Sequence, residues 1–225
     1  MTKKAVILLS GGLDSTTCLA IAKSQGYTCY ALSVEYGQKH SVELSAAKKV
    51  ADFFHVAKHE IATVTIGHFG GSALTDKNLD VPNYVPNTND IPITYVPARN
   101  TTFLSIALGL AEINEAEAIF IGANAVDYSG YPDCRPAYFD AFQTMANLAT
   151  KAGVSGQKIT VETPILNLTK ADIITLGISL GVDYSMTISC YRATPTGLAC
   201  GTCDSCALRK KGFLDANIAD PTHYV

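Results

Sequence analysis

The sequence contains no apolar run that approaches the roughly 20 residues needed to cross a bilayer, so we expect no membrane span. The apolar stretch near the N-terminus is short and leads into a glycine turn instead of the small-residue cleavage site of a signal peptide. We therefore expect an unexported, cytoplasmic protein. An excess of basic residues is also missing, because the 17 Lys and Arg are outnumbered by 20 Asp and Glu. Neutralising a nucleic-acid backbone needs clustered cations, so we expect no direct nucleic-acid partner, although a nucleotide-sized ligand fits this charge.

Several familiar signatures are absent as well. There is no internal repeat, no low-complexity segment, no GxxxxGK[ST] phosphate loop and no GxGxxG dinucleotide fingerprint. The five histidines form no pair with metal-ligand spacing, and no Ser/His/Asp context suggests a hydrolytic triad. Repeat arrays, two common nucleotide-binding classes and serine hydrolases are therefore disfavoured.

The cysteines are few but unevenly placed. Four of the seven lie within residues 190–206, and the other three are scattered. An odd total fits a disulfide framework poorly and favours a reduced compartment with a metal site.

Along the chain, apolar β-type runs alternate with helical patterns. Strands are expected at residues 4–9, 28–36, 57–64, 117–124 and near 158–164, and helices at 15–26, 41–54, 99–114, 136–152 and 169–180. Nearly all-apolar strands alternating with helices indicate a doubly wound α/β fold, in which a parallel sheet is covered on both faces.

Two further segments fall outside this alternation. Residues 65–97 are long and irregular, which is typical of lids, interface elements or disordered segments, and a homodimer is expected. After residue 186 the pattern changes, so we predict a main domain at 1–186 and a small cysteine-rich appendage at 187–225.

The first strand ends in a glycine turn that feeds a helix, with the sequence SGGLDS from Ser10 to Ser15. Glycines let the backbone approach a ligand, and the N–H groups at a helix N-terminus attract anions. Asp14 would repel a bare phosphate, but a Mg²⁺ ion bound to the phosphates removes the conflict. An ordinary strand-to-helix turn, capped by Asp14 or Ser15, is the alternative.

This string resembles the pyrophosphate loop SGGxDS of the N-type ATP pyrophosphatases, whose fold is of the adenine nucleotide alpha hydrolase type. The resemblance implies that ATP is cleaved between its α and β phosphates to leave an adenylate. It also implies that residues 34–36, at the end of the second strand, lie beside the adenine. The implied ATP-binding residues are Leu8, Leu9, Ser10, Gly11, Gly12, Leu13, Asp14, Ser15, Thr16, Thr17 and Cys18.

The tail cysteines are spaced C-x9-C-x2-C-x2-C, at Cys190, Cys200, Cys203 and Cys206. Four thiolates close a tetrahedral coordination sphere and leave no position for water, so we expect one structural zinc. Disulfides and an iron–sulfur cluster remain as alternatives. Of the others, Cys18 and Cys29 are expected to be plain core residues.

Polar segments at two other places are candidates for binding an acid substrate. Arg99 and Asn100 begin a predicted helix, where a cation is unfavourable unless an anion offsets it, although Asn100 is also a candidate N-cap. The second segment is the loop at residues 122–135, after the fourth strand, where α/β sheets bind ligands. It offers carboxylates, aromatic planes and a guanidinium at Asp127, Asp133, Tyr128, Tyr131 and Arg135. A surface loop without a ligand is the alternative.

Lys170 also begins a predicted helix, after the sequence LNLT. A cation is unfavourable at a helix N-terminus, so we expect Lys170 to face phosphate. An ordinary helix start at Thr169-Lys170 is the alternative.

Five strings together, SGGLDSTTC, VEYGQKH, VPARN, GANAVDYSGYPDCR and CGTCDSCALR, look like the 7-cyano-7-deazaguanine synthases, the queuosine-pathway family of this superfamily. The resemblance runs from Val6 to about Arg209. It implies a ligase that converts 7-carboxy-7-deazaguanine, ammonia and ATP into the nitrile preQ0, through an adenylated carboxylate and an amide. It also implies zinc on the four tail cysteines and Mg²⁺ with ATP.

Within this hypothesis Asp127 or Asp133 accepts from the N–H edge of the deazaguanine, and Arg99 or Arg135 holds its carboxylate. No residue stands out as a covalent nucleophile, and no glutaminase segment is present, so ammonia is expected to be free. The alternatives are a tRNA thiolation enzyme, which would need a basic surface and a catalytic cysteine pair, and a non-catalytic nucleotide-binding zinc module.

Overall fold

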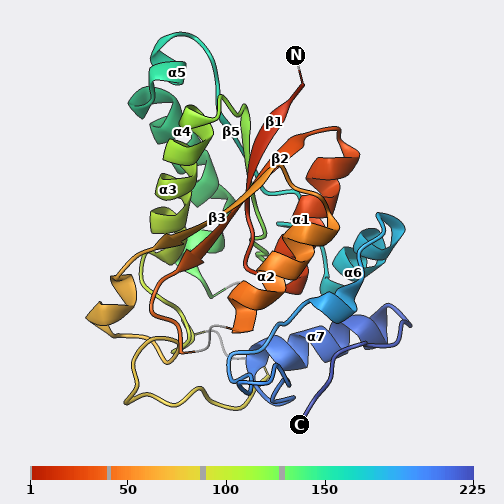
Figure 1. The fold of residues 1–225 in the computed structure, drawn as a ribbon. Coiled ribbons are helices and arrows are strands. Elements are labelled where there is room, and N and C mark those ends of the chain that lie inside the picture. The colour runs from red at the N-terminus through yellow and green to blue at the C-terminus, as the bar shows by residue number, and fades with distance from the viewer. Residues whose placement is uncertain (1, 40–41, 87–89, 127–129) are drawn as a thin grey trace.

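A parallel sheet of five strands forms the centre of the computed structural model, which describes residues 2–39, 42–86, 90–126 and 130–225 (Figure 1). The strands are β1 Lys4–Leu8, β2 Thr28–Glu35, β3 Lys58–Thr63, β4 Ala118–Ile121 and β5 Thr160–Glu162. Their spatial order is β3-β2-β1-β4-β5, and each neighbouring pair is parallel. The predicted doubly wound α/β class is confirmed.

The helices follow the strands in alternation. They are α1 Leu13–Ser24, α2 Val42–Phe53, α3 Arg99–Ile113, α4 Pro136–Ala149, α5 Lys151–Val154, α6 Lys170–Ser179 and α7 Asp204–Asp215. Short 3₁₀ turns lie at Ile66–Phe69, Pro132–Cys134 and Tyr184–Met186. Within the described ranges, no helix combines the length and apolar character needed to cross a membrane.

One helical prediction needs correction, and one helix was not predicted. The helix expected over 136–152 is interrupted at Thr150, whose backbone is extended and whose hydroxyl accepts from the Gly153 N–H at 3.1 Å. Threonine is a preferred N-cap residue, so a new short helix, α5, begins directly after Thr150. The tail also contains α7, which the cysteine spacing gave no reason to expect.

The sheet separates two hydrophobic cores because side chains alternate along each strand. Val6 and Leu8 of β1 face a core with α3 and α4, while Ala5 and Ile7 face a core with α1 and α6. Figure 1 shows α3, α4 and α5 on one side of the sheet and α1, α2 and α6 on the other.

The cysteine-rich tail contributes to both cores. Cys203 and Cys206 are buried with the first, and Phe213 of α7, which is 1% exposed, is buried with the second. In Figure 1, α7 lies beside α6 below the sheet. The tail is therefore packed against the α/β layers along most of its length.

The strand order determines where a ligand would bind. From β1 the chain winds outward through β2 to β3, and from β4 it winds the opposite way to β5. Ligands of open α/β sheets bind at the carboxyl ends of the strands where this reversal occurs. The loops after β1 and β4 meet at that point.

Candidate functional site

A cavity of about 240 Å³ opens at the carboxyl ends of β1, β2 and β4. It brings together segments that are far apart in the sequence: the loop after β1, the end of β2, the start of α3, the loop after β4, the start of α6 and residues 188–191. Of the residues singled out from the sequence, those that line it are Leu8, Leu9, Ser10, Gly12, Leu13, Asp14, Ser15, Arg99, Asn100, Tyr131, Lys170 and Cys190. Val34 and Tyr36, expected beside an adenine, line it too.

The loop after β1 is held by its own serines. The Ser10 N–H donates to the Ser15 hydroxyl oxygen at 3.2 Å, and the two hydroxyls lie 3.0 Å apart. The Gly12 N–H donates to the Ser10 hydroxyl at 3.3 Å. These bonds fix the turn at the edge of the cavity before any ligand binds.

Gly11 lets this loop pack closely against α2. Its φ is +82°, a conformation that favours glycine, and a Cβ atom there would lie 2.5 Å from both the Ala47 nitrogen and the Glu43 carbonyl oxygen. Gly122, after β4, is similarly close to α1, because its Cβ would lie 2.8 Å from the Ser15 nitrogen. Both glycines are required by close backbone approach.

The last three residues of the expected ATP segment are buried and do not line the cavity. The Thr16 hydroxyl donates to the Gly12 carbonyl at 2.9 Å, and the Thr17 hydroxyl bonds the Leu13 carbonyl at 2.9 Å and the Tyr184 hydroxyl at 2.7 Å. Cys18 is fully buried in the core, and this burial raises the pKa of its thiol. Their contacts hold α1 in place.

Lys170 and Asp14 form an ion pair that lines the cavity. The Lys170 Nζ donates to both carboxylate oxygens of Asp14, at 2.8 and 2.9 Å, and the lysine is 8% exposed. Thr169 caps α6 by accepting from the Asp172 N–H, which sets the start of the helix at Lys170. A cation and an oxygen ligand for a hard metal ion are thus presented side by side at the loop.

Arg99 is the first residue of α3 and lines the cavity. The helix is preceded by Ala98 at φ +56°, so the reading of Asn100 as N-cap is wrong. Burial alone would lower the pKa of Arg99, but the neighbouring Tyr36 and Tyr131 hold it above its ordinary value. Arg99 therefore presents a stable positive charge to the cavity.

Asn100 is held by Asp133. Its backbone N–H donates to the Asp133 carboxylate at 3.1 Å, and its side-chain amide donates to the Asp133 carbonyl at 3.0 Å. Asp133 is buried behind the cavity wall, and its other carboxylate oxygen has no hydrogen-bond partner among the described residues. Arg135 is exposed and does not line the cavity, and Asp127 and Tyr128 lie outside the described residues.

Sequence reasoning missed several residues that line the cavity, among them Glu43, Ser189 and Tyr191. Burial raises the pKa of Glu43 to about 7, although Arg99 opposes the shift. In the sequence Glu43 looks like an ordinary acid in the first turn of a helix. Ser189 and Tyr191 flank the first tail cysteine, and this proximity is the one signal that could have identified them.

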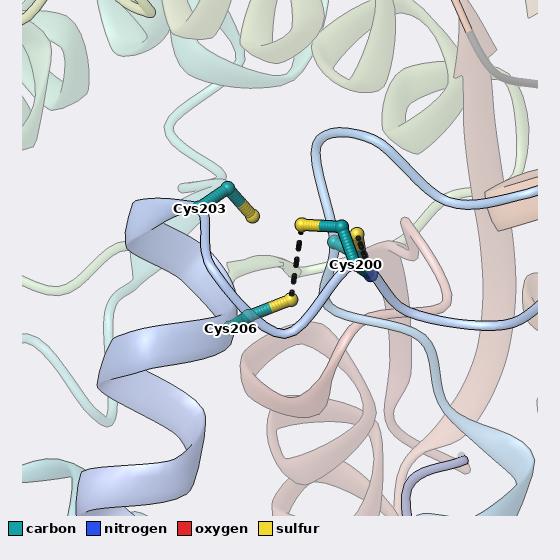
Figure 2. A group of neighbouring side chains, drawn as sticks. Cys200, Cys203 and Cys206 are labelled. Atoms are coloured by element: carbon teal, nitrogen blue, oxygen red, sulfur yellow. Dashed lines mark hydrogen bonds between the residues drawn. The ribbon is translucent and has the colours of Figure 1, made fainter. Parts of the chain in front are cut away.

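The four tail cysteines converge on one point. Their sulfur atoms all lie within 4.8 Å of one another, and Figure 2 shows those of Cys200, Cys203 and Cys206 turned toward a common centre. The sulfurs of Cys200 and Cys206 are 3.9 Å apart. Tetrahedral zinc with bonds of about 2.3 Å needs sulfurs about 3.8 Å apart, so the donor set fits such an ion.

Backbone N–H groups point at these sulfurs. The Cys200 and Arg192 N–H groups donate to the Cys190 sulfur at 3.2 and 3.3 Å, and the Tyr191 N–H donates to the Cys203 sulfur at 3.4 Å. Hydrogen bonds of this kind favour the thiolates that a metal requires.

Comparison with known proteins places these features in a family. The sequence matches the model of the family described as "Queuosine biosynthesis protein QueC" over residues 4–217. It is 68% identical over 223 residues to a 7-cyano-7-deazaguanine synthase of Coxiella burnetii (strain RSA 331 / Henzerling II), covering 99% of this chain and 98% of that protein. A synthase of the same name from Saccharophagus degradans (strain 2-40 / ATCC 43961 / DSM 17024) is 63% identical over 222 residues, covering 99% and 98% of the two chains.

The fold also resembles solved structures of lower sequence identity. The NMN synthetase of Francisella tularensis superposes with a TM-score of 0.51 at 16% identity, over 97% of this chain and 79% of that one. At this identity the likeness shows the fold alone.

Proposed function

The chain belongs to the family of the queuosine biosynthesis protein QueC, and from this membership we propose that it is an ATP-dependent ligase that makes 7-cyano-7-deazaguanine. The substrates are 7-carboxy-7-deazaguanine, ammonia and ATP. One observation carries the proposal: relatives of that name match the chain from end to end. The cavity agrees with it, because it gathers the glycine loop, the Asp14–Lys170 pair and Arg99 around one space.

In the first step the substrate carboxylate attacks the α-phosphorus of ATP, which forms the acyl adenylate and releases pyrophosphate. The loop from Ser10 to Ser15 and the N-terminus of α1 hold the outer phosphates, and Lys170 supplies a positive charge beside them. The end of β2, at Val34 and Tyr36, contacts the adenine. Positioning and electrostatics supply the catalysis, and no covalent enzyme intermediate is involved.

Ammonia then attacks the adenylate carbonyl, and AMP leaves with formation of the amide. The amide oxygen then attacks the α-phosphorus of a second ATP and releases pyrophosphate, and loss of AMP and a proton from the adenylated imidate gives the nitrile. Arg99 holds the substrate carboxylate before activation, since it lines the cavity and keeps its positive charge there. Asp133 keeps Asn100 in place, and Tyr131, which lines the cavity, contacts the deazaguanine ring. Asp127, expected to accept from the N–H edge of the ring, lies outside the described residues.

Two metals accompany this chemistry. The Asp14 carboxylate offers the oxygen ligands that Mg²⁺ prefers, so it would hold the ion, which would supply positive charge beside the phosphates. The four cysteines hold a structural zinc ion, which their sulfur separations fit.

Residues 187–225 form a zinc-binding appendage on the ATP-binding domain of residues 1–186, and the protein acts in the cytoplasm as a homodimer. The segment at 65–97 supplies the dimer interface, where Phe69 is 84% exposed. Light scattering at micromolar concentration should give twice the mass of one chain, and Phe69→Ser should lower it.

The activity is tested by incubating the metal-replete protein with ATP, Mg²⁺, ammonium and 7-carboxy-7-deazaguanine. Mass spectrometry should find the nitrile, and the nucleotide product should be AMP. Formation of ADP, or ATP binding without turnover, would contradict the proposal. Release of an adenylated tRNA would instead identify a thiolation enzyme.

A further inference from the structure

The segment from Ile188 to Tyr191 lies between the glycine loop and the four-cysteine site. Its first two residues contact the loop. The Ile188 N–H donates to the Gly11 carbonyl at 3.0 Å, and the Leu13 N–H donates to the Ser189 hydroxyl oxygen at 3.2 Å. We call residues 188–191 the bridging segment.

Ser189 replaces a missing helix cap. Leu13 is the first residue of α1, and the N-cap residue, Gly12, has no side chain to accept from the first N–H groups of the helix. The Ser189 hydroxyl accepts one of them from 176 residues away in the sequence. The N-terminus of α1, which is proposed to bind phosphate, is thus capped and oriented by Ser189 of the tail.

The other half of the bridging segment belongs to the metal site and the cavity. Cys190 is one of the four sulfur ligands, and the Tyr191 N–H donates to the sulfur of Cys203. The Tyr191 side chain lines the cavity and lies near Arg99. Consecutive Cα atoms are about 3.8 Å apart, so a displacement of the Cys190 backbone is passed to Ser189 on one side and to Tyr191 on the other.

We propose that the four-cysteine site positions the phosphate-binding loop, with Ser189 as the positioning residue through which metal binding at Cys190 reaches the N-terminus of α1. The inference rests on the proposed function for the identity of the nucleotide. A metal that only held the tail together would affect overall stability and leave ATP affinity in the folded protein unchanged.

The first experiment measures the ATP dissociation constant of metal-loaded protein by calorimetry, with Mg²⁺ and without the other substrates. Ser189→Ala should weaken ATP binding about five- to tenfold, the usual effect of losing one hydrogen bond, and Ser189→Thr should restore most of it. Ser185→Ala is the matched control, because that serine is exposed four residues upstream and should bind ATP like the wild type.

Unchanged or tighter ATP binding by Ser189→Ala would overturn the inference, since the hydroxyl would then be neutral or in competition with phosphate. Failure of the wild type itself to bind ATP would contradict the proposed function. The two failures are therefore distinguishable.

The second experiment follows hydrogen exchange of the peptide spanning residues 8–16 with Zn²⁺ bound and after chelation. Chelation should speed exchange there in the wild type and have a smaller effect in Ser189→Ala, where the coupling is already broken. Equal effects of chelation in both proteins would overturn the inference. If chelation unfolds the chain, this will be seen as loss of the helical circular dichroism signal. In that case the metal-loaded wild type is compared with metal-loaded Ser189→Ala. Faster exchange in the variant supports the inference, and equal exchange refutes it.

Discussion

At the scale of single residues, the cavity distinguishes side chains that look equivalent in the sequence. Arg99 begins α3 and Arg135 immediately precedes α4, each after an irregular segment, and each was a candidate to hold a carboxylate. The structure puts Arg99 in the cavity wall and leaves Arg135 exposed. Burial and position decide between them.

Arg99→Ala should therefore raise the KM for 7-carboxy-7-deazaguanine about 100-fold, since a charged hydrogen-bond partner of the carboxylate is lost. Arg135→Ala should change that KM less than about twofold, because the side chain does not line the cavity. Steady-state kinetics with each substrate varied in turn measures both. A larger effect at Arg135 would reverse the assignment.

Glu43 provides a prediction about pH. Burial raises the pKa of this carboxyl from 4.5 to about 7 in the folded protein. A raised folded-state pKa means that ionisation is easier in the unfolded chain, so the residue destabilises the fold progressively as the pH rises from about 4.5 to 7. Below that range both states are protonated and the effect disappears.

Glu43→Gln removes the ionisation. The gain in Tm of the variant over the wild type should therefore be larger at pH 8 than at pH 5, as measured by thermal unfolding in matched buffers. A gain that is the same at both values would show that Glu43 keeps an ordinary pKa.

At the scale of secondary-structure elements, glycines determine how closely the helices approach the site. Gly11 and Gly26 have nearly the same φ, +82° and +83°, but their surroundings differ. A Cβ at Gly11 would meet the backbone of α2, whereas no described atom lies within 4 Å of one at Gly26. Substitutions at the two positions therefore distinguish the cost of backbone strain from the cost of a steric clash.

Gly26→Ala should cost about 1 kcal/mol, the strain of a left-handed backbone conformation. Gly11→Ala should cost a further 1–3 kcal/mol or so, because α2 must move. Urea unfolding measures both values, and equal costs would mean that the loop and α2 can separate freely.

The contact between α6 and α7 depends on another glycine. A Cβ at Gly212 of α7 would lie 2.3 Å from Cγ of Lys170. The absence of a side chain at Gly212 therefore leaves space for the aliphatic part of Lys170, whose Nζ contacts Asp14. Gly109 in α3 is also helical but has no described atom within 4 Å of its Cβ position. The tail helix thus helps to place the cation of the site.

Gly109→Ala should stabilise the protein by about 0.5–1 kcal/mol through helix propensity. Gly212→Ala should destabilise it by about 1–3 kcal/mol and weaken ATP binding, since Lys170 is displaced. Thermal unfolding and calorimetry measure the two effects. A stabilising Gly212→Ala would show that α7 does not support Lys170.

At the scale of the whole molecule, the tail is joined to the α/β layers by buried contacts. The Arg209 guanidinium, 1% exposed, donates to the Thr187 hydroxyl at 2.8 Å, to the Tyr184 carbonyl at 3.0 Å and to Asp220 at 3.2 Å. Tyr184 in turn bonds Thr17 of α1. Phe213 completes the core on that side of the sheet.

A chain truncated after residue 186 should therefore lose at least about 10 °C of Tm, or its cooperative transition altogether, because a buried aromatic residue and a buried cation network are removed. Calorimetric unfolding of the truncated and full chains compares them. An unchanged Tm would show that residues 1–186 fold independently of the appendage.

Much of the architecture was accessible from the sequence. Apolar runs alternating with helical periodicity determine the order of strands and helices, and the five strands lie close to their predicted ranges. The glycine turn after β1 and the spacing of four cysteines are local patterns, so the sequence locates both, and the structure brings the four cysteine sulfurs together. The helix break at Thr150 and the existence of α7 were missed, because both depend on packing that local periodicity does not encode.

The tertiary structure alone decided which side chains share the cavity. Asp14 and Lys170 are separated by 156 residues, and Leu13 and Ser189 by 176, so no local pattern links them. Glu43 has a raised pKa because neighbouring elements bury it, and Asp133 lies behind Asn100 and does not line the cavity. Periodicity and spacing act over a few residues, whereas burial and electrostatics depend on every element that surrounds a group in space, and only the folded chain specifies those neighbours.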